Sequence, residues 1–501
     1  MPAEGSKLNY RLIGFSFPAS ANCTLQIASG HFDDDGSFVK NIVVSKHCSM
    51  GNMIAEVPSF GTNYTWRVIY AGKTSANSDG TFHHFSTLPW FNLDSSKSRL
   101  RVITNSGKFN GNYIFVDATK TMYDMRGRPV WFLPDKKVAS SGNITVRDLK
   151  VTPSGSVTYL FGESAREVDY NGNTIWEGPV NGRISGDTAE HFHHELTKLS
   201  NAHYMVMGNE TVASNVPYYH PADAQAPDAS VIKNNRDSFL QKISFGTLIE
   251  YDSAGKVVWS WKSSAYFRTA DLYGHYLSDG RFPVTDVHAN AFFFDEKKKV
   301  IYVGFRNISR IVKIKYPQGN VLAVYGAKCT SGPCDICSDL FCGQHSIRVA
   351  ANGDLYLFNN NAVAISATPQ VLVLKETPGK DQLKKVWQYD CTLDGMSENE
   401  LNEYTKKSQQ MQMLGQRDSS MMQTLRLSSG GNAVELGDGS FLVTMSGVFG
   451  KIFVVNKNKE VLWSAVPEVK IFDDAPWTTI GSYRASMVTR RQLQALIWNT
   501  K

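Results

Sequence analysis

Short segments in which apolar and polar residues alternate run through most of the chain, separated by Gly, Asn, Asp and Ser. A period of two is typical of strands buried on one face, and the separating residues are those that form tight turns. The first such segments are residues 10–15, 23–27, 53–57 and 64–70. They predict a small β-sandwich of immunoglobulin or fibronectin type over residues 1–92, a structural or docking module with His83 and His84 on its surface.

From about residue 93 a longer pattern repeats. One element is an apolar strand, a polar turn and a second strand, and its six copies end at Trp131, Trp176, Trp259, Leu322, Trp387 and Trp463. A second hairpin carries, at one shared position, Arg147, His194, His288, His345 and Gly431. Two hairpins per repeat of about 40–50 residues are typical of propeller blades. We therefore predict an all-β protein: a six-bladed β-propeller over residues 93–501, preceded by the β-sandwich.

Three segments depart from the repeat. Residues 212–243 are rich in Asn, Asp, Ser, Pro and Ala, which predicts a long loop on the rim of a blade. Ser397-Glu-Asn-Glu400 is a capping box, which predicts a helix through about Gln412. Residues 480–488 read as a last strand that closes the ring by pairing with the first blade.

The inner hairpins carry the candidate chemistry. His345 lies seven residues before Asn352 of an Asn-Gly turn, and His194 and His288 lie seven before corresponding turn residues. Because the innermost strand of every blade faces the axis, these histidines should meet, together with Arg147. Alternation places Asp286, His288 and Asn290 on one face. The hairpin is centred near residue 297, so Arg306 should lie opposite His288.

A cluster of three histidines and one or two arginines suits an oxyanion such as sulfate or phosphate. Two other functions fit the same residues. Three histidines also suit a metal ion, although an arginine across the strand would repel a cation. The propeller could also bind an anionic or phenolic ligand without catalysis. Net charge is +6 from 52 basic and 46 acidic residues, too mild and scattered to favour nucleic acid.

Cysteines and sequons bear on the compartment. A Cys23–Cys48 bridge would suit the sandwich, and a second group precedes His345 and comprises Cys329, Cys334, Cys337 and Cys342. The spacing of this group is compatible with a zinc knuckle, but we expect disulfides that shape a loop at the site. Asn-x-Ser/Thr triplets occur at Asn22, Asn63, Asn143, Asn209 and Asn307. Together they favour a secreted or periplasmic protein, although the chain starts without a signal peptide and contains no apolar run long enough to span a membrane.

Four motifs resemble the bacterial arylsulfate sulfotransferase family: His193-His194-Glu195-Leu196, Val287-His288-Ala289-Asn290 with Arg306 eighteen residues after the histidine, Gly343-Gln344-His345-Ser346, and Ser482-Tyr483-Arg484-Ala485. The resemblance implies a six-bladed propeller that moves a sulfuryl group from an aryl sulfate donor to a phenolic acceptor, without a nucleotide sulfate donor. The nucleophile of the family matches His345. Its supporting residues match His194, His288, Asn290 and Arg306. Tyr483 and Arg147 are expected to contact the substrate.

In the implied reaction, neutral His345 attacks sulfur and becomes a sulfohistidine, and a second substrate then accepts the group in a ping-pong sequence. No metal or other cofactor is expected, because cationic side chains supply the charge. The expected partners are the small-molecule donor and acceptor, without nucleic acid or a membrane span, and a homodimer stays open. The extra cysteines before His345 and the 212–243 segment depart from the family pattern and bear on substrate identity.

Overall fold

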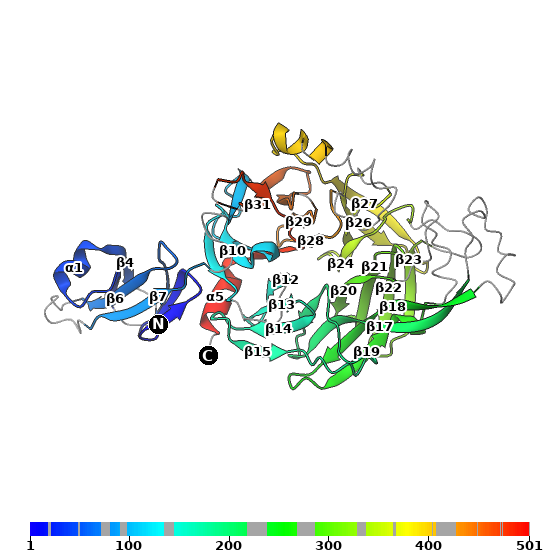
Figure 1. The fold of residues 1–501 in the computed structure, drawn as a ribbon, viewed down its shortest axis with the longest axis horizontal. Helices are drawn as coiled ribbons and strands as arrows, with labels where there is room; N and C mark the ends of the chain where they lie inside the picture. The colour runs from blue at the N-terminus through cyan, green and yellow to red at the C-terminus, as the bar shows by residue number, and fades with distance from the viewer. Residues whose placement is uncertain are drawn as a thin grey trace.

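The computed structural model describes residues 1–18, 22–48, 51–71, 81–90, 98–134, 145–217, 238–267, 286–327, 337–363, 367–402, 404–406, 427–447, 449–470, 472 and 474–499. Almost all regular structure in these residues is β-sheet. The N-terminal strands form a small body at one end of the molecule, and the remaining sheets are arranged as a ring beside it (Figure 1).

The N-terminal body contains two sheets. The larger has the order β1-β7-β6-β3-β4, with β1 Ser6–Leu8, β7 His83–Thr87, β6 Asn63–Tyr70, β3 Cys23–Ser29 and β4 Ile42–Cys48. The smaller pairs β2 (Leu12–Ser16) with β5 (Asn52–Glu56), and a short helix α1 (Asp35–Lys40) precedes β4. All four strands expected before residue 92 are present. The division at residue 92 itself stays a prediction, because residues 91–97 lie outside the described part of the chain.

The predicted Cys23–Cys48 bridge is wrong for this structure. The two cysteines lie directly opposite each other on β3 and β4, so the pairing in space was right, but both are buried free thiols. Burial, and after it the contact with Cys23, raises the pKa of Cys48 to about 12. A thiol with so high a pKa provides little of the thiolate that disulfide formation requires.

Six sheets of the described residues form the blades of the propeller, and each contains an inner-to-outer run of four antiparallel strands. The first two blades are β33 (Ala485–Val488), β9 (Tyr113–Val116), β10 (Thr121–Asp124) and β11 (Pro129–Phe132), then β12 (Val146–Val151), β13 (Val157–Phe161), β14 (Ser164–Val168) and β15 (Thr174–Glu177). The third and fourth are β16 (Leu196–Lys198), β17 (Tyr204–Pro217), β18 (Ser238–Tyr251) and β19 (Val257–Lys262), then β20 (Ala289–Asp295), β21 (Val300–Phe305), β22 (Arg310–Lys315) and β23 (Val321–Gly326).

The fifth blade is β24 (His345–Val349), β25 (Leu355–Asn359), β26 (Gln370–Glu376) and β27 (Leu383–Asp390). The sixth is β28 (Asn432–Glu435), β29 (Phe441–Thr444), β30 (Ile452–Val455) and β31 (Val461–Val469), extended by β8 (Ser98–Asn105) and β32 (Thr478–Thr479). The six-bladed prediction is therefore confirmed. Strand β33 is the innermost strand of the first blade, where Ala485 pairs with Val116, so the end of the chain closes the ring as expected.

The repeated tryptophans fasten one blade to the next. Four of them lie on the fourth strand of a blade and donate the indole N–H to a backbone carbonyl in the outer hairpin of the following blade, whereas the buried indole N–H of Trp176 has no hydrogen-bond partner. The bonds are Trp131 to Tyr170 (2.8 Å), Trp259 to Pro317 (2.7 Å), Trp387 to Lys457 (3.0 Å) and, from the last blade to the first, Trp463 to Met125 (2.8 Å). These bonds join four of the six blade junctions and help to keep neighbouring blades in register.

Of the two predicted insertions, the structure contradicts the first and confirms the second. The predicted loop over residues 212–243 is wrong at both ends, because β17 and β18 continue as a 14-residue antiparallel ladder from Tyr204↔Tyr251 to Pro217↔Ser238. The β-branched and aromatic residues near these ends outweigh the polar composition of the segment. Residues 218–237 lie outside the described residues. The capping box is confirmed: the Glu400 carboxylate accepts from Ser397 N at 2.7 Å, ahead of a helix over 398–402 whose extension beyond 406 is not described.

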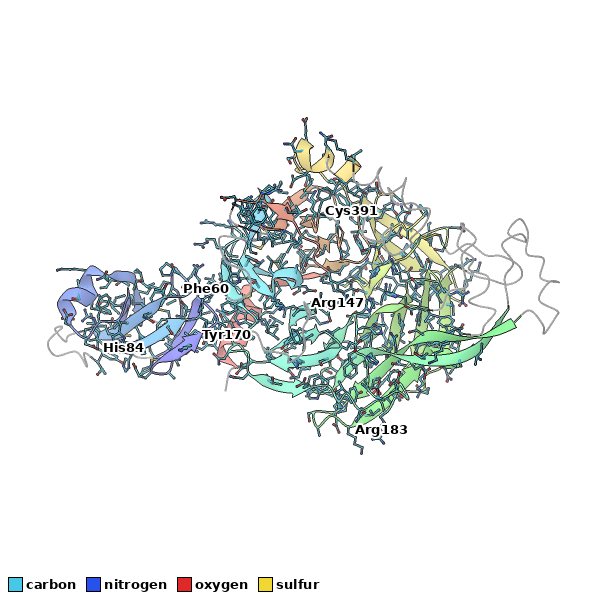
Figure 2. The ribbon with its side chains drawn as sticks, viewed as in Figure 1. Phe60, His84, Arg147, Tyr170, Arg183 and Cys391 are labelled. Carbon is cyan, nitrogen blue, oxygen red and sulfur yellow. A yellow bond between two sulfur atoms is a disulfide. The ribbon has the colours of Figure 1, made fainter. Side chains whose placement is uncertain are left out.

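The sandwich and the propeller share one hydrophobic core. Tyr10 stacks on Tyr170 at 4.1 Å and Phe60 meets Phe132 edge to face at 5.3 Å, near the labelled Tyr170 and Phe60 of Figure 2. Helix α5 (Arg490–Trp498) continues this contact along β2. A Cβ at Gly14 would lie 2.6 Å from Ile497 Cγ2, so only glycine lets the helix approach this strand.

A disulfide joins Cys337 to Cys342 just before His345. This bears out the expected bridging for these two cysteines and excludes a four-cysteine zinc knuckle. Cys329 and Cys334 lie outside the described residues, and Cys391 is a buried free thiol. Among the described residues, no helix is both long enough and apolar enough to cross a membrane.

Candidate active site

The candidate side chains come from the first residues of the inner strands. Here the backbone takes the left-handed conformation at Asp148, His194, His288 and Ser346, with φ of 57°, 60°, 55° and 55°. The register of the inner hairpin also shifts between Arg147 and Lys150, between Ala289 and Ala291, and between His345 and Arg348. Such bulges redirect side chains at the rim of a sheet.

This geometry corrects the shared register. His194 and His288 occupy the left-handed position, whereas His345 lies one residue before it. Counting residues back from the turns did not reveal this one-residue offset of His345, because the count assumes regular pairing along the whole hairpin. The histidines nevertheless meet at the axis. The rings of His194 and His288 are 4.9 Å apart, and Tyr483 lies 5.7 Å from His194 and 6.4 Å from His345.

His345 is buried and held in one orientation by Asn360. Its Nδ1 lies 2.5 Å from Asn360 Oδ1. The Asn360 amide nitrogen donates to the backbone carbonyls of Ser428 at 3.1 Å and Gly430 at 2.8 Å, which fixes the amide oxygen toward His345. An amide oxygen only accepts, so Nδ1 carries the proton and Nε2 carries the lone pair.

The surroundings keep this imidazole uncharged. Burial holds the pKa of His345 well below its usual value, and the positive charge of Arg306 lowers it further. The pKa of His194 is likewise well below the usual value, first because of burial and then because of its histidine neighbours. A neutral imidazole with a free Nε2 is a nucleophile, whereas imidazolium is not.

His288 is oriented by an acidic partner. Asp286 Oδ2 lies 2.9 Å from His288 Nδ1, and Asp286 Oδ1 accepts from the His288 backbone N–H at 2.7 Å. Although burial opposes the charge, bonds to His288 lower the pKa of Asp286 overall. The carboxylate leaves the Nε2 edge of His288 available for proton transfer. His194 is held differently, with its Nδ1 2.6 Å from Nδ1 of the neighbouring His193.

Two arginines lie close to the histidines. Arg306 N donates to the His288 carbonyl at 2.9 Å, which confirms the predicted position opposite His288. Its guanidinium acts on His345 through charge and donates to Asn307 Oδ1 at 3.2 Å. Arg147, labelled near the middle of the ring in Figure 2, lies 5.2 Å from the ring of Tyr483. The structure therefore brings all seven predicted site residues into one region.

Asn290 supports the segment that carries His345. Its side-chain amide donates to the Gln344 carbonyl at 2.7 Å, and the Gln344 amide donates to the Arg310 carbonyl at 2.8 Å. Asn290 is fully buried, and its Oδ1 is a buried acceptor without a hydrogen-bond partner. Asn290 therefore positions the segment that carries His345. Its expected contact with the substrate stays a prediction.

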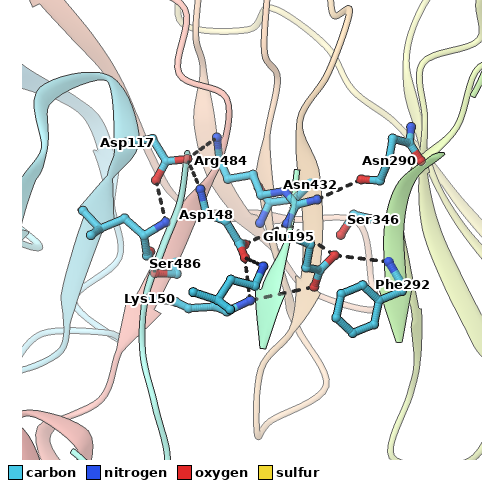
Figure 3. A network of polar contacts seen from close by, with 12 residues as sticks. Asp117, Asp148, Lys150, Glu195, Asn290, Phe292, Ser346, Asn432, Arg484 and Ser486 are labelled. Carbon is cyan, nitrogen blue, oxygen red and sulfur yellow. Dashed lines mark hydrogen bonds and ion pairs between the residues drawn. The ribbon is translucent and has the colours of Figure 1, made fainter. Parts of the chain in front are cut away.

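A buried ionic network underlies the cluster (Figure 3). Arg484 bonds Asp148 at 2.7 Å and lies 3.5 Å from Glu195, which also pairs with Arg348. Asp117 accepts from the backbone nitrogens of Asp148 and Arg484, at 2.9 and 3.2 Å, and burial raises its pKa to about 7. The network joins the first, second, third and fifth blades at the axis, so it fixes where the inner strands point.

Two cavities flank the network. A cavity of about 170 Å³ is lined by Glu163, His191, Phe192, His193, His194, Asn209, Asp286, His288 and Ala289. A larger one of about 800 Å³ is bounded by turns of the inner hairpins and by Asp148, Lys150, Glu195, Arg348 and Arg484. No histidine lines the larger cavity, and members of the ionic network form part of its wall. His194 and His288 line the smaller cavity, whereas the buried His345 lines neither of the two.

Sequence reasoning missed Asn360 and gave no role to His193. A signal for Asn360 existed: His345 pairs with Phe358, so period two places Asn360 on the same side of the hairpin. The arithmetic that located Arg306 would have found it. Asn307, one of the sequons, donates its amide to the Asp286 carbonyl at 2.9 Å and so forms part of the site.

Fold and site together define a propeller enzyme with an uncharged histidine and two arginines at its axis, an arrangement suited to an anionic substrate. The model of the family "Arylsulfotransferase (ASST)" matches residues 94–411. The chain belongs to this family and is therefore a sulfotransferase, which confirms the resemblance seen in its motifs. No curated protein matches the chain.

Solved structures resemble the chain only distantly. A protein of unknown function from Bacteroides caccae is 10% identical, with 78% of this chain and 99% of that one covered and a TM-score of 0.40. The periplasmic gluconolactonase of Pseudomonas aeruginosa is 9% identical, with coverages of 78% and 99% and a TM-score of 0.34. A protein from Lactobacillus plantarum is 10% identical, with coverages of 93% and 99% and a TM-score of 0.31. The six sheets themselves define the propeller fold.

Replacing Asn360 by Leu tests the orientation of His345. The change keeps a side chain with the same branching but removes the acceptor for Nδ1–H, so both tautomers become populated. We expect kcat to fall about tenfold to a hundredfold, as when the orienting partner of a functional histidine is lost. Nitrogen-15 NMR of the His345 ring should show a mixture of tautomers in the variant and one in the parent. An unchanged ring spectrum would contradict the role of Asn360.

Proposed function

We propose that the protein transfers a sulfuryl group from an aryl sulfate to a phenol, with Nε2 of His345 as the covalent carrier and no nucleotide donor. One observation carries the proposal. His345 is buried, uncharged and tethered through Nδ1 to Asn360, which leaves a single nucleophilic atom beside two arginines. The match to the sulfotransferase family supports a sulfate ester as the group that this atom attacks.

In the first half-reaction, the Nε2 lone pair of His345 forms a bond to sulfur as the bond from sulfur to the aryl oxygen breaks. The electron pair of that bond leaves on the phenolate oxygen. Protonated His288 donates its Nε2 proton to this oxygen, and Asp286 stabilises the charge on the ring beforehand. Arg306 and Arg147 donate to the three peripheral sulfate oxygens, where charge shifts in the transition state.

In the second half-reaction, His288 accepts the proton of the incoming phenol. The phenol oxygen attacks sulfur, the N–S bond breaks, and its electrons return to Nε2 of His345. Each half-reaction therefore moves one proton through His288 in opposite directions, and the enzyme returns to its starting state. His194 and Tyr483 border the same space and would contact the aryl rings.

The test is a single-turnover experiment with the intact protein and a chromogenic aryl sulfate without an acceptor. A fast release of about one phenol per chain is expected, followed by a sulfuryl adduct on the peptide containing His345. Addition of phenol should discharge the adduct. Steady release without a burst, or transfer that requires a nucleotide sulfate donor, would overturn the proposal.

Arg306→Lys keeps the positive charge but replaces a planar fork of donors by a single ammonium group. We expect kcat/KM for an aryl sulfate to fall about 10²-fold, the scale of losing one oxyanion donor. Arg166→Lys is a matched control, because Arg166 pairs with Glu177 on β14 and β15, away from the axis, and its turnover should stay normal. Equal rates for the two variants would remove Arg306 from the sulfate site.

We also propose a secreted or periplasmic location. The Cys337–Cys342 disulfide, whose second cysteine lies three residues before His345, supports an oxidising compartment.

A further inference from the structure

A second group of potential ligands lies far from the axis, on the N-terminal sheet. His31 and Asp33 follow β3, and His84 lies on β7. One ring nitrogen or carboxylate oxygen of each lies within 4.8 Å of the others. Among the described residues, this is the one group of three His, Cys, Asp or Glu side chains that meets this distance. The labelled His84 in Figure 2 marks its place in the sandwich, remote from the axis.

We propose that His31, Asp33 and His84 bind a divalent transition-metal ion, with zinc as the expected species. Two imidazole nitrogens and a carboxylate oxygen are a ligand set that zinc prefers, and water completes a tetrahedral shell. The rings of His31 and His84 stack at 3.8 Å, so the two imidazole ligands are adjacent. His84 Nε2 already lies 3.5 Å from Asp33 Oδ1.

The other nitrogen of His84 has the partner that metal-binding histidines usually have. Glu4 Oε1 lies 3.1 Å from His84 Nδ1 and its carboxylate also accepts from the His84 backbone N–H at 3.1 Å. A carboxylate on Nδ1 favours the tautomer that offers Nε2 to a metal and increases its basicity. A bound ion would replace the present contact of Nε2 with the Phe32 carbonyl at 3.3 Å. His83 Nδ1, 3.5 Å from Glu4 Oε2, helps to hold the carboxylate in place.

The loop that carries His31 and Asp33 is held at both ends. Gly30 N donates to the Asn63 carbonyl at 2.8 Å, and Phe32 N donates to Thr65 Oγ1 at 3.0 Å. Beyond the loop, Asp34 caps α1 by accepting from Ser37 N at 2.8 Å. The backbone that carries two of the ligands is thus held before any ion binds, which reduces the entropy lost on binding.

The site is open to solvent on one side. The His31 and Asp33 side chains are 60% and 78% exposed, whereas His84 is 17% exposed. An ion can therefore enter without rearrangement of the sheet. Bound there, it would link the β3–α1 loop to β7 and, through Glu4, to the residues before β1. We infer that its effect is to stabilise the sandwich rather than to take part in sulfuryl transfer.

Zinc titration of the full chain by calorimetry tests the site. The parent should bind one equivalent at the sandwich, and zinc should raise its unfolding temperature. His31→Ala, His84→Ala and the exposed change Asp33→Asn should each weaken binding at least about tenfold, and Glu4→Gln about tenfold. Each variant should also lose the zinc-dependent rise in unfolding temperature.

Two controls separate this site from other histidines. His47→Ala changes an exposed histidine on β4 of the same sheet and should leave binding intact. His345→Asn should also leave it intact. Absence of saturable binding by the parent, binding retained in both His31→Ala and His84→Ala, or binding lost in His345→Asn would each overturn the proposal.

Discussion

Replacing His345 by Asn is expected to abolish sulfuryl transfer, with turnover falling by about 10⁴-fold or more. Removing a nucleophile eliminates the covalent route, and the arginines alone cannot replace it. The burst of phenol and the sulfuryl adduct should both disappear. The measurement is turnover of a chromogenic aryl sulfate with added phenol, together with intact-mass analysis after incubation with donor alone.

His203→Asn is the matched control. His203 pairs with Glu250 at 2.8 Å in the inner hairpin of the third blade, at the end of the strand away from the cluster. Its turnover and adduct should match the parent. If the adduct instead maps to His194 or His288, the covalent mechanism stands and the carrier is misassigned. Full turnover by His345→Asn would refute the mechanism.

The blade architecture could be predicted because each blade repeats the same local physics. Alternation marks each strand, a Gly or polar turn marks each hairpin, and in four blades a tryptophan of the fourth strand bonds the next blade. Such signals depend on residues close in sequence. The position of Arg306 opposite His288 followed for the same reason, since one hairpin relates them.

The offset of His345, the bond from Asn360 and the length of β17 and β18 depend on contacts that sequence spacing does not encode. The bulges at Arg147, Ala289 and His345 add residues to one strand, and they shift His345 relative to the other histidines. The bond from Asn360 to His345 depends on carbonyls of Ser428 and Gly430, about 70 residues later. Composition also misled in one place, because a polar segment extends the ladder of β17 and β18.

The sequence likewise predicts which cysteines are neighbours but not whether they form a disulfide. The sequence suggests that Cys23 and Cys48 are neighbours, and the structure agrees. Whether neighbouring thiols are joined depends on their thiolate fraction and on the oxidant, which spacing alone does not reveal.

Replacing Arg484 by Met is expected to lower the free energy of unfolding by about 3–5 kcal/mol, the usual cost of leaving a buried carboxylate without its partner. Arg484 is only 3% exposed, and its guanidinium bonds Asp148 at 2.7 Å, near Glu195 at 3.5 Å. Methionine fills similar volume, so the loss measures charge rather than a cavity. Urea unfolding followed by tryptophan fluorescence gives the difference.

Arg128→Met provides the comparison, because Arg128 also bonds a carboxylate, Asp124 at 2.7 Å, but is 54% exposed. That loss should stay below about 1 kcal/mol. The contrast follows from burial: water screens the exposed Arg128 pair, whereas the side chains of Arg484 and Asp148 are only 4% and 5% exposed. If both variants lose the same small amount, Lys150, 2.7 Å from Asp148, compensates the carboxylate alone. Arg484 would then serve to hold Tyr483 beside the histidines rather than to stabilise the ring.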